Sequence, residues 1–168
     1  MKVIMTCGKP CSGKTTYAKA YCEQHNAVLL SADELMLSLF GNDAGEKHDE
    51  YVEKIKAYLL RKSVELVSCG VNVVLDWGLW TKAERSAVRE FYHRNGISCG
   101  IHYLDIDDET WCKRIMARNT AIFDGKSDDY YVDDALVAKF ESIFEEPDKN
   151  EVDFWMAQEK NDETCFFK

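Results

Sequence analysis

The stretch that decides the fold of this chain reads Gly8-Lys9-Pro10-Cys11-Ser12-Gly13-Lys14-Thr15. It matches the pattern G-x-x-x-x-G-K-[ST] of a phosphate-binding loop, which joins a strand to a helix. The flanking residues provide that context, because an apolar run precedes the loop at 3–5 and a segment without glycine or proline follows at 17–22. With glycine at only about 7% of average usage, this spacing rarely arises by chance.

The residue types of this loop suit a bound phosphate. Gly8 and Gly13 allow backbone angles that turn successive amides inward around an anion. The helix that begins near Gly13 adds free N–H groups and the positive end of its dipole. Lys14 lies in the first turn of that helix, where a cation is unfavourable unless an anion faces it. The alternative, a glycine-rich turn with an incidental lysine, does not explain the context of the loop.

The pattern also indicates how a nucleoside triphosphate and its metal would be held. We expect the hydroxyl of Thr15 to bind Mg²⁺ and that of Thr16 to reach a more distal phosphate. Cys11 and Ser12 lie within the loop, and we expect them to contact the same phosphates. Lys14 is then a catalytic residue that stabilises the charge of the transferred phosphoryl group.

Size and composition describe one soluble domain over 1–168. The chain is 46% hydrophobic and 30% charged, and no apolar run approaches the roughly 20 residues of a membrane helix. The apolar run at the start is too short for a signal peptide. Seven cysteines, an odd number without C-x-x-C spacing, favour reduced thiols and a cytoplasmic location. The net charge of −9 disfavours nucleic acid as a partner.

Strand and helix patterns alternate along the chain, which predicts a three-layer α/β fold with a parallel sheet of about five strands. A polar stretch at 119–129 lacks apolar periodicity, and we expect it to form part of a lid over about 119–133. The expected strands are 3–5, 28–30, 71–76, 98–104 and 152–156, and the expected helices after the loop are 33–40, 48–68, 82–94, 107–117 and 133–144.

Two aspartates follow expected strands at the edge where such sheets bind ligands. Asp33 can accept a proton from a substrate hydroxyl, and its alternative role is to cap the helix that it opens. Asp76 closes an apolar strand, the setting of the acidic residue that helps to hold Mg²⁺, directly or through water. Asp76 could also contact the substrate.

Aromatic and basic residues complete the candidate site. Trp77 and Trp80 either wall an acceptor pocket or pack over the edge of the sheet. Arg114 and Arg118 are four residues apart on one helix face, and we expect them to cover the phosphates as part of the lid. The alternative is a solvated helix face. Arg85 is a weaker candidate for contact with an anionic group, since it could equally be an ordinary arginine on the surface of a helix.

In order and spacing, five motifs resemble the small P-loop kinases grouped with AAA-family ATP-binding proteins, relatives of zeta toxins, chloramphenicol phosphotransferase and the polynucleotide kinase domain. The motifs are 8–16, 31–34, 74–80, 114–119 and 144–147. The resemblance implies a nucleotide- or shikimate-kinase-like fold and ATP-dependent phosphorylation of a hydroxyl. It also implies that Asp33 is the base, that Arg114 stacks on adenine and that Arg118 touches phosphate.

The charges of the segment after the second expected strand narrow the class of acceptor. No basic residue occurs from Ser31 to Glu46, whereas a nucleotide-monophosphate kinase needs arginines there to hold the acceptor phosphate. We therefore expect an ATP- and Mg²⁺-dependent kinase that acts on a hydroxyl of a neutral or cationic small molecule. A toxin-like or antibiotic-modifying phosphotransferase is the alternative within enzymes. An ATP-binding regulatory protein without kinase turnover is the alternative from another class.

Overall fold

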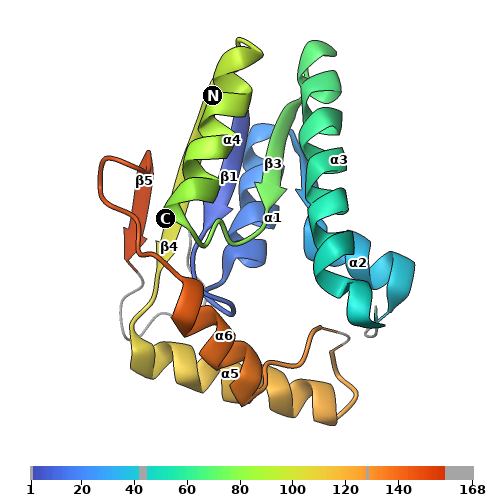
Figure 1. Cartoon of the computed structure of the whole chain (residues 1–168), viewed down its shortest axis with the longest axis vertical. Helices are drawn as coiled ribbons and strands as arrows, with labels where there is room; N and C mark the ends of the chain where they lie inside the picture. The colour runs from blue at the N-terminus through green and yellow to red at the C-terminus, as the bar shows by residue number, and fades with distance from the viewer. Residues whose placement is uncertain (1, 42–44, 128, 158–168) are drawn as a thin grey trace.

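The computed structural model describes residues 2–41, 45–127 and 129–157. Its five strands form one parallel sheet in the order β2-β3-β1-β4-β5 (Figure 1). The strands are β1 (Val3–Cys7), β2 (Ala27–Ser31), β3 (Asn72–Asp76), β4 (Cys99–Asp105) and β5 (Phe154–Ala157). The helices are α1 (Lys14–His25), α2 (Ala32–Phe40), the 3₁₀ turn η1 (Gly45–Lys47), α3 (His48–Ser68), α4 (Lys82–Arg94), α5 (Asp108–Phe123) and α6 (Asp134–Ile143). The predicted three-layer α/β fold with a parallel sheet is confirmed.

Two hydrophobic clusters hold the layers together, because alternate residues of each strand face opposite sides of the sheet. Val3 and Met5 of β1 face the larger cluster, to which α3 and α4 contribute. Ile4 faces a smaller cluster with Ala18 of α1 and Val74 of β3. The sheet is therefore covered by α1 on one face and by α3 and α4 on the other (Figure 1).

Helices α5 and α6 lie beyond the carboxyl ends of the strands rather than on a face of the sheet (Figure 1). The helix predicted over 107–117 is longer in the structure, where α5 continues to Phe123. No glycine or proline interrupts this segment until Gly125, which has a φ of 67° and ends the helix. The residues that α5 adds beyond the prediction mix polar and apolar side chains, and Phe123 is 91% exposed, so the absence of apolar periodicity did not indicate a loop.

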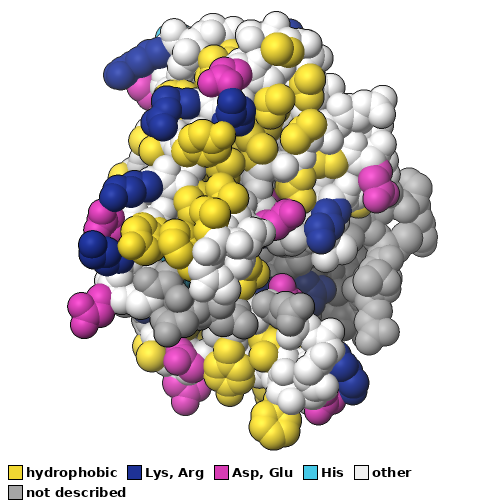
Figure 2. All heavy atoms as spheres, turned by 90° about the vertical axis from the view of Figure 1, so that its right-hand side faces the viewer, with side chains coloured by type: hydrophobic (Ala, Val, Ile, Leu, Met, Phe, Trp, Pro, Cys, Tyr) yellow, Lys and Arg dark blue, Asp and Glu magenta, His cyan; other side chains and the backbone are white. Residues whose placement is uncertain are grey.

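An exposed apolar region lies on the side of the molecule formed by α2, α3 and the edge strand β2. Figure 2 shows hydrophobic side chains gathered on this side. The exposed hydrophobic residues of these elements are Val28, Leu39, Phe40 and Tyr58. None of the helices in the described part of the chain combines the length and apolarity needed to cross a bilayer.

Candidate functional site

The phosphate-binding loop connects β1 to α1 and is held in a strained backbone conformation. Gly8 has a φ of 144°, and a Cβ atom added there would lie 2.7 Å from the carbonyl oxygen of Leu104. The amide of Gly8 donates to the Gly78 carbonyl oxygen over 3.0 Å. Cys11 and Gly13 also have positive φ values, 59° and 91°. Three of the six residues from 8 to 13 thus have positive φ. Such a backbone conformation makes the amides of the loop, not its side chains, define its shape.

The ammonium of Lys14 lies over this loop. Its Nζ donates to the carbonyl oxygens of Gly8 and Lys9 over 3.2 and 2.6 Å. Burial lowers the pKa of Lys14, and the carboxylates of Asp76 and Asp33 oppose that shift. The first turn of α1 contains no acidic residue, so the positive end of its dipole is not offset within the helix. The loop is therefore an electropositive centre with two carboxylates beside it.

Asp76 at the end of β3 joins the strand to the loop. Its Oδ1 accepts from Thr6 over 2.9 Å and its Oδ2 accepts from Thr15 over 2.7 Å. Asp76 is 4% exposed, and Thr6 is fully buried. A carboxylate and a hydroxyl this close are hard oxygen donors of the kind that Mg²⁺ prefers, so Thr15 and Asp76 fit a magnesium site. Thr16 and Ser12 lie on the same loop–helix junction, Thr16 exposed and Ser12 buried.

Asp33 is placed for a role other than capping. The cap of α2 is Ser31, whose Oγ accepts from the amide of Glu34 over 3.3 Å. Water reaches the Asp33 side chain, yet the surrounding protein atoms desolvate the carboxylate and raise its pKa. Lys14 is the strongest opposing influence on that pKa, and Asp76 adds to the rise. The structure thus brings Asp33 toward the phosphate loop without giving it the capping role.

Helix α5 is docked against the loop at its amino-terminal end. The indole Nε1 of Trp111 donates to the carbonyl oxygen of Pro10 over 2.7 Å, and Lys9 pairs with Asp108. The Lys9 ammonium also lies 4.7 Å from the centroid of the Trp111 ring. These contacts set the distance between the loop and the helix that carries the candidate arginines.

Both candidate arginines act on the loop electrostatically. Burial raises the pKa of the Cys11 thiol, whereas Arg118, Lys14 and Arg114 lower it. Arg118 also lowers the pKa of Asp33, and its Nε lies 4.0 Å from Asp129 Oδ2. The charge of Arg118 therefore acts both on the loop and on the start of α2.

The two tryptophans belong to packed clusters. Trp77 is 6% exposed in the main core, and the Trp80 ring contacts the Phe140 ring edge-to-face at a centroid distance of 5.4 Å. Gly78 lies between them, and a Cβ atom there would lie 1.9 Å from Trp80 Nε1. Of the two interpretations of these residues, the structure favours packing.

Arg85 is buried in α4, where it ties three segments together. Its guanidinium donates to the carbonyl oxygens of Leu79 and Glu145 over 3.2 and 2.9 Å and pairs with Glu151 at 2.8 Å. Partial burial favours a higher pKa for Glu151, but hydrogen bonds from Lys82 and Arg85 outweigh it and lower the pKa to about 2. These contacts place Arg85 in a structural network around the loop that follows β3, not on a substrate.

We expect Arg85→Met to reduce the free energy of unfolding by about 3 kcal/mol, because it leaves buried carbonyls and a carboxylate without their donor. Urea unfolding of the purified variant measures this. Arg94→Met is the matched control, since Arg94 lies on the same helix with its side chain 74% exposed. Equal stability of the two variants would contradict the structural role.

Three contacts of this site escaped the sequence patterns. Thr6 lies in a strand and supports Asp76, and nothing in its local sequence distinguishes it from a core position. Asn119 donates to the Val132 carbonyl oxygen and accepts from the Val132 amide, over 2.7 and 3.0 Å. The hydroxyl of Tyr130 is buried beside α3. The contacts of Thr6 and Asn119 depend on partners in other segments, and the burial of the Tyr130 hydroxyl depends on tertiary packing.

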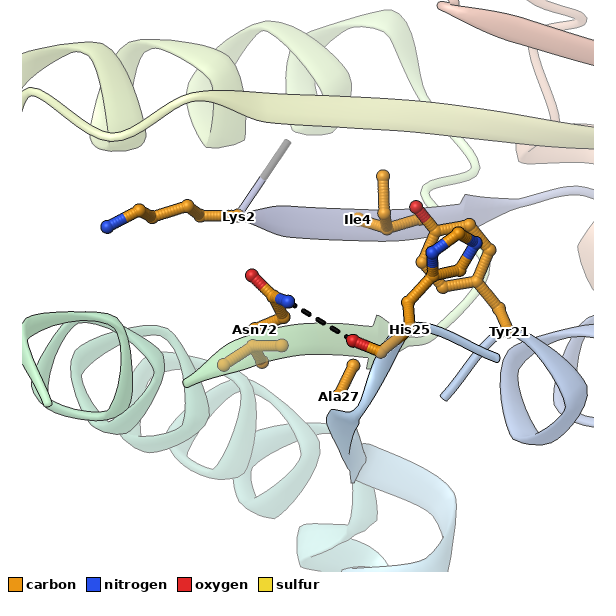
Figure 3. Close-up of a pocket in the computed structure, with 7 residues that line it drawn as sticks. Lys2, Ile4, Tyr21, His25, Ala27 and Asn72 are labelled. Atoms are coloured by element: carbon orange, nitrogen blue, oxygen red, sulfur yellow. Dashed lines mark hydrogen bonds between the residues drawn. The ribbon is translucent and has the colours of Figure 1, made fainter. Parts of the chain in front are cut away.

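A cavity at the opposite end of the sheet lies away from these residues. It has a volume of about 360 Å³ and is lined by Lys2, Ile4, Tyr21, His25, Ala27, Asn72 and Val73 (Figure 3). The Asn72 amide donates to the His25 carbonyl oxygen there over 3.2 Å. Because parallel sheets bind ligands beyond the carboxyl ends of their strands, the candidate site remains at the loop.

Comparison with solved structures shows the same fold in several kinases. A sugar kinase from Janibacter sp. HTCC2649 is 17% identical, with a TM-score of 0.63 over 94% of this chain and 84% of that one. A gluconokinase from Sinorhizobium meliloti 1021 is 13% identical, with a TM-score of 0.64 over 92% and 81%. The APS kinase CysC of Mycobacterium tuberculosis is 17% identical, with a TM-score of 0.61 over 95% and 90%.

A search of the curated proteins returned no significant match. The family model described as an AAA domain matches residues 3–147, which include the phosphate loop, both candidate carboxylates and α5. A match over that much of the sequence, together with the P-loop, implies nucleotide binding. The chain belongs to the AAA domain family, with the P-loop fold that small kinases share.

Proposed function

We propose that this protein is an ATP-dependent kinase that transfers the γ-phosphate to a hydroxyl of a small molecule. The observation that carries the proposal is a phosphate loop with a carboxylate bound to it: Asp76 accepts from Thr15 over 2.7 Å, and the charges of Asp76 and Asp33 both favour the protonated form of Lys14. Nucleotide binding needs Lys14 and the Thr15–Asp76 pair. A carboxylate such as Asp33, with its capping role taken by Ser31, suits an acceptor that must lose a proton.

Each residue has one task in this reaction. The loop amides and Lys14 hold the phosphates, with contacts from Cys11, Ser12 and Thr16. Asp33 receives the acceptor proton as the acceptor oxygen bonds to the γ-phosphorus, and the bond from that phosphorus to the β-phosphate oxygen breaks, releasing ADP. Arg118 stabilises the transferred charge. Arg114 contacts adenine. Thr15 and Asp76 would hold Mg²⁺, which would neutralise phosphate charge.

The acceptor is neutral or cationic in this proposal. Of the four basic residues on α3 and α4 that could offset the acidic segment after β2, Lys54, Lys56 and Arg85 are paired, and Arg61 is exposed to solvent. Lys56 lies 3.1 Å from Glu84 and 3.3 Å from Glu53, Lys54 pairs with Glu50, and Arg85 pairs with Glu151. An acceptor with its own phosphate would therefore enter a region with little free positive charge.

A phosphoryl-transfer screen tests the proposal. Purified protein is incubated with Mg-ATP and pools of hydroxylated metabolites, nucleosides and aminoglycoside antibiotics, and phosphorylated products are identified by mass spectrometry. We expect a product from one pool that is absent with Lys14→Ala and with Asp33→Asn. Tight ATP binding without any product above the level of these variants would favour the regulatory alternative. An antibiotic as the sole acceptor would favour the antibiotic-modifying alternative.

The pH dependence of turnover follows from the environment of Asp33. Desolvation and Asp76 raise the pKa of Asp33, while Lys14, Arg118 and Lys56 oppose the rise. A general base works only when deprotonated, so kcat/KM for the acceptor is expected to fall as the pH drops through a value above the usual aspartate range. Steady-state rates across pH measure this limb. A profile that stays flat down to the usual aspartate range would contradict the role of Asp33.

A further inference from the structure

Tyr130 lies in the segment between α5 and α6 and has a buried hydroxyl. That hydroxyl has no hydrogen-bond partner among the residues that the structure describes. The ring packs against the main hydrophobic core, so the side chain is anchored. A buried hydroxyl without a partner is costly, which indicates that a polar group from outside the chain completes it.

Contacts on both sides hold the segment of Tyr130 against α3. The side-chain amide of Asn119 forms two hydrogen bonds with the backbone of Val132, which ties the segment to α5. Lys139 of α6 pairs with Asp49 of α3 at 3.2 Å. The Tyr130 ring meets the edge of His48, the first residue of α3, at a centroid distance of 6.2 Å. Tyr130 is therefore held next to the first turn of α3.

The charge of Asp33 also acts on the hydroxyl of Tyr130. Burial raises the pKa of Tyr130, and the charge of Asp33 raises it further. The phenol therefore keeps its proton near neutral pH and can donate a hydrogen bond. A donor held beside a base suits a molecule that presents one hydroxyl to Asp33 and a second polar group to Tyr130.

We propose that Tyr130 is an acceptor-positioning residue, whose hydroxyl binds a second hydroxyl of a polyhydroxylated acceptor beside the one that Asp33 deprotonates. This inference rests on the proposed kinase function and narrows its acceptor from any alcohol to a polyol. A compound with a single hydroxyl leaves the Tyr130 hydroxyl unpaired and is a poor acceptor.

The test compares the wild-type protein with Tyr130→Phe and with the control Tyr131→Phe, whose adjacent tyrosine is 58% exposed. Mg-ATP-dependent phosphorylation is measured with ribitol, myo-inositol, glucose, kanamycin and the single-hydroxyl compound 1-propanol. We expect the best polyol to lose about tenfold in kcat/KM with Tyr130→Phe, mainly through KM, as one lost hydrogen bond predicts. KM for ATP and the melting temperature stay unchanged, and Tyr131→Phe behaves as wild type.

Equal use of the best polyol by wild type and Tyr130→Phe overturns the inference while the kinase stands, and so does a preference for 1-propanol. If wild type phosphorylates none of the probes, that result counts against the kinase proposal and does not test the role of Tyr130. Polyol binding is then measured as a shift in melting temperature with Mg²⁺ and a non-hydrolysable ATP analogue. Stabilisation of wild type that Tyr130→Phe weakens supports the role of Tyr130, and no stabilisation, or an equal one, overturns it.

Discussion

Asp33→Asn is expected to lower kcat by about 10³-fold while ATP binds at least as tightly as to wild type. The loss follows because an amide cannot accept the acceptor proton, a step usually worth about 10²–10⁴-fold. ATP affinity is retained because the substitution removes a negative charge from beside the phosphates and leaves the loop and Lys14 in place. Single-turnover rates and calorimetric ATP titration measure the two quantities.

The control for Asp33→Asn is Asp134→Asn. Asp134 is an exposed aspartate in the first turn of α6, so its loss changes a helix terminus in the same way as the loss of Asp33. We expect the control to keep wild-type turnover. Turnover by Asp33→Asn within about threefold of wild type would leave the protein without its proposed base and would favour the regulatory alternative.

Lys14→Ala is expected to weaken ATP binding and to lower kcat by about 10²–10³-fold, the usual effect of removing a charge-stabilising donor. The ammonium of Lys14 donates to two loop carbonyls, and the charges of Asp76 and Asp33 favour its protonated form. Lys14→Arg is not expected to restore activity, since the planar guanidinium is larger than the ammonium that fits between these carbonyls. ATP titration and steady-state kinetics distinguish the binding defect from the turnover defect.

Lys19→Ala is the matched control, because Lys19 is exposed on the same helix and the substitution is the same. Wild-type ATP affinity is expected for this variant. ATP affinity of Lys14→Ala equal to that of Lys19→Ala would place the nucleotide elsewhere on the molecule and would contradict the role of the loop. Together with the Asp33 variant, this pair distinguishes nucleotide binding from acceptor activation.

The phosphate loop and the order of the elements could be predicted from the sequence because both are local. A loop that turns amides inward needs Gly8 and Gly13 at a fixed spacing, and the structure gives both positive φ values. The helices predicted over 48–68 and 82–94 are confirmed with the same bounds. In α4 the Thr81–Glu84 capping box and the apolar stripe both act within a few residues.

The partners within the site depended on the tertiary structure. Thr6 and Thr15 meet on Asp76 across separations of 70 and 61 residues. That meeting follows from β3 pairing with β1, and parallel strands that are all apolar do not reveal their order along a sheet. The burial of Arg85 was not predictable for the same reason, since Arg85 has the sequence context of a surface helix but is 2% exposed.

The sequence by itself determined that this chain forms a phosphate loop in an alternating α/β fold, because backbone conformation and hydrophobic periodicity are properties of neighbouring residues. Only the tertiary structure decided which side chains face the loop. It removed Asp33 from the capping role, buried Arg85 against Glu151 and held Tyr130 beside α3. These outcomes depend on packing between distant segments, where burial and long-range hydrogen bonds outweigh local preference.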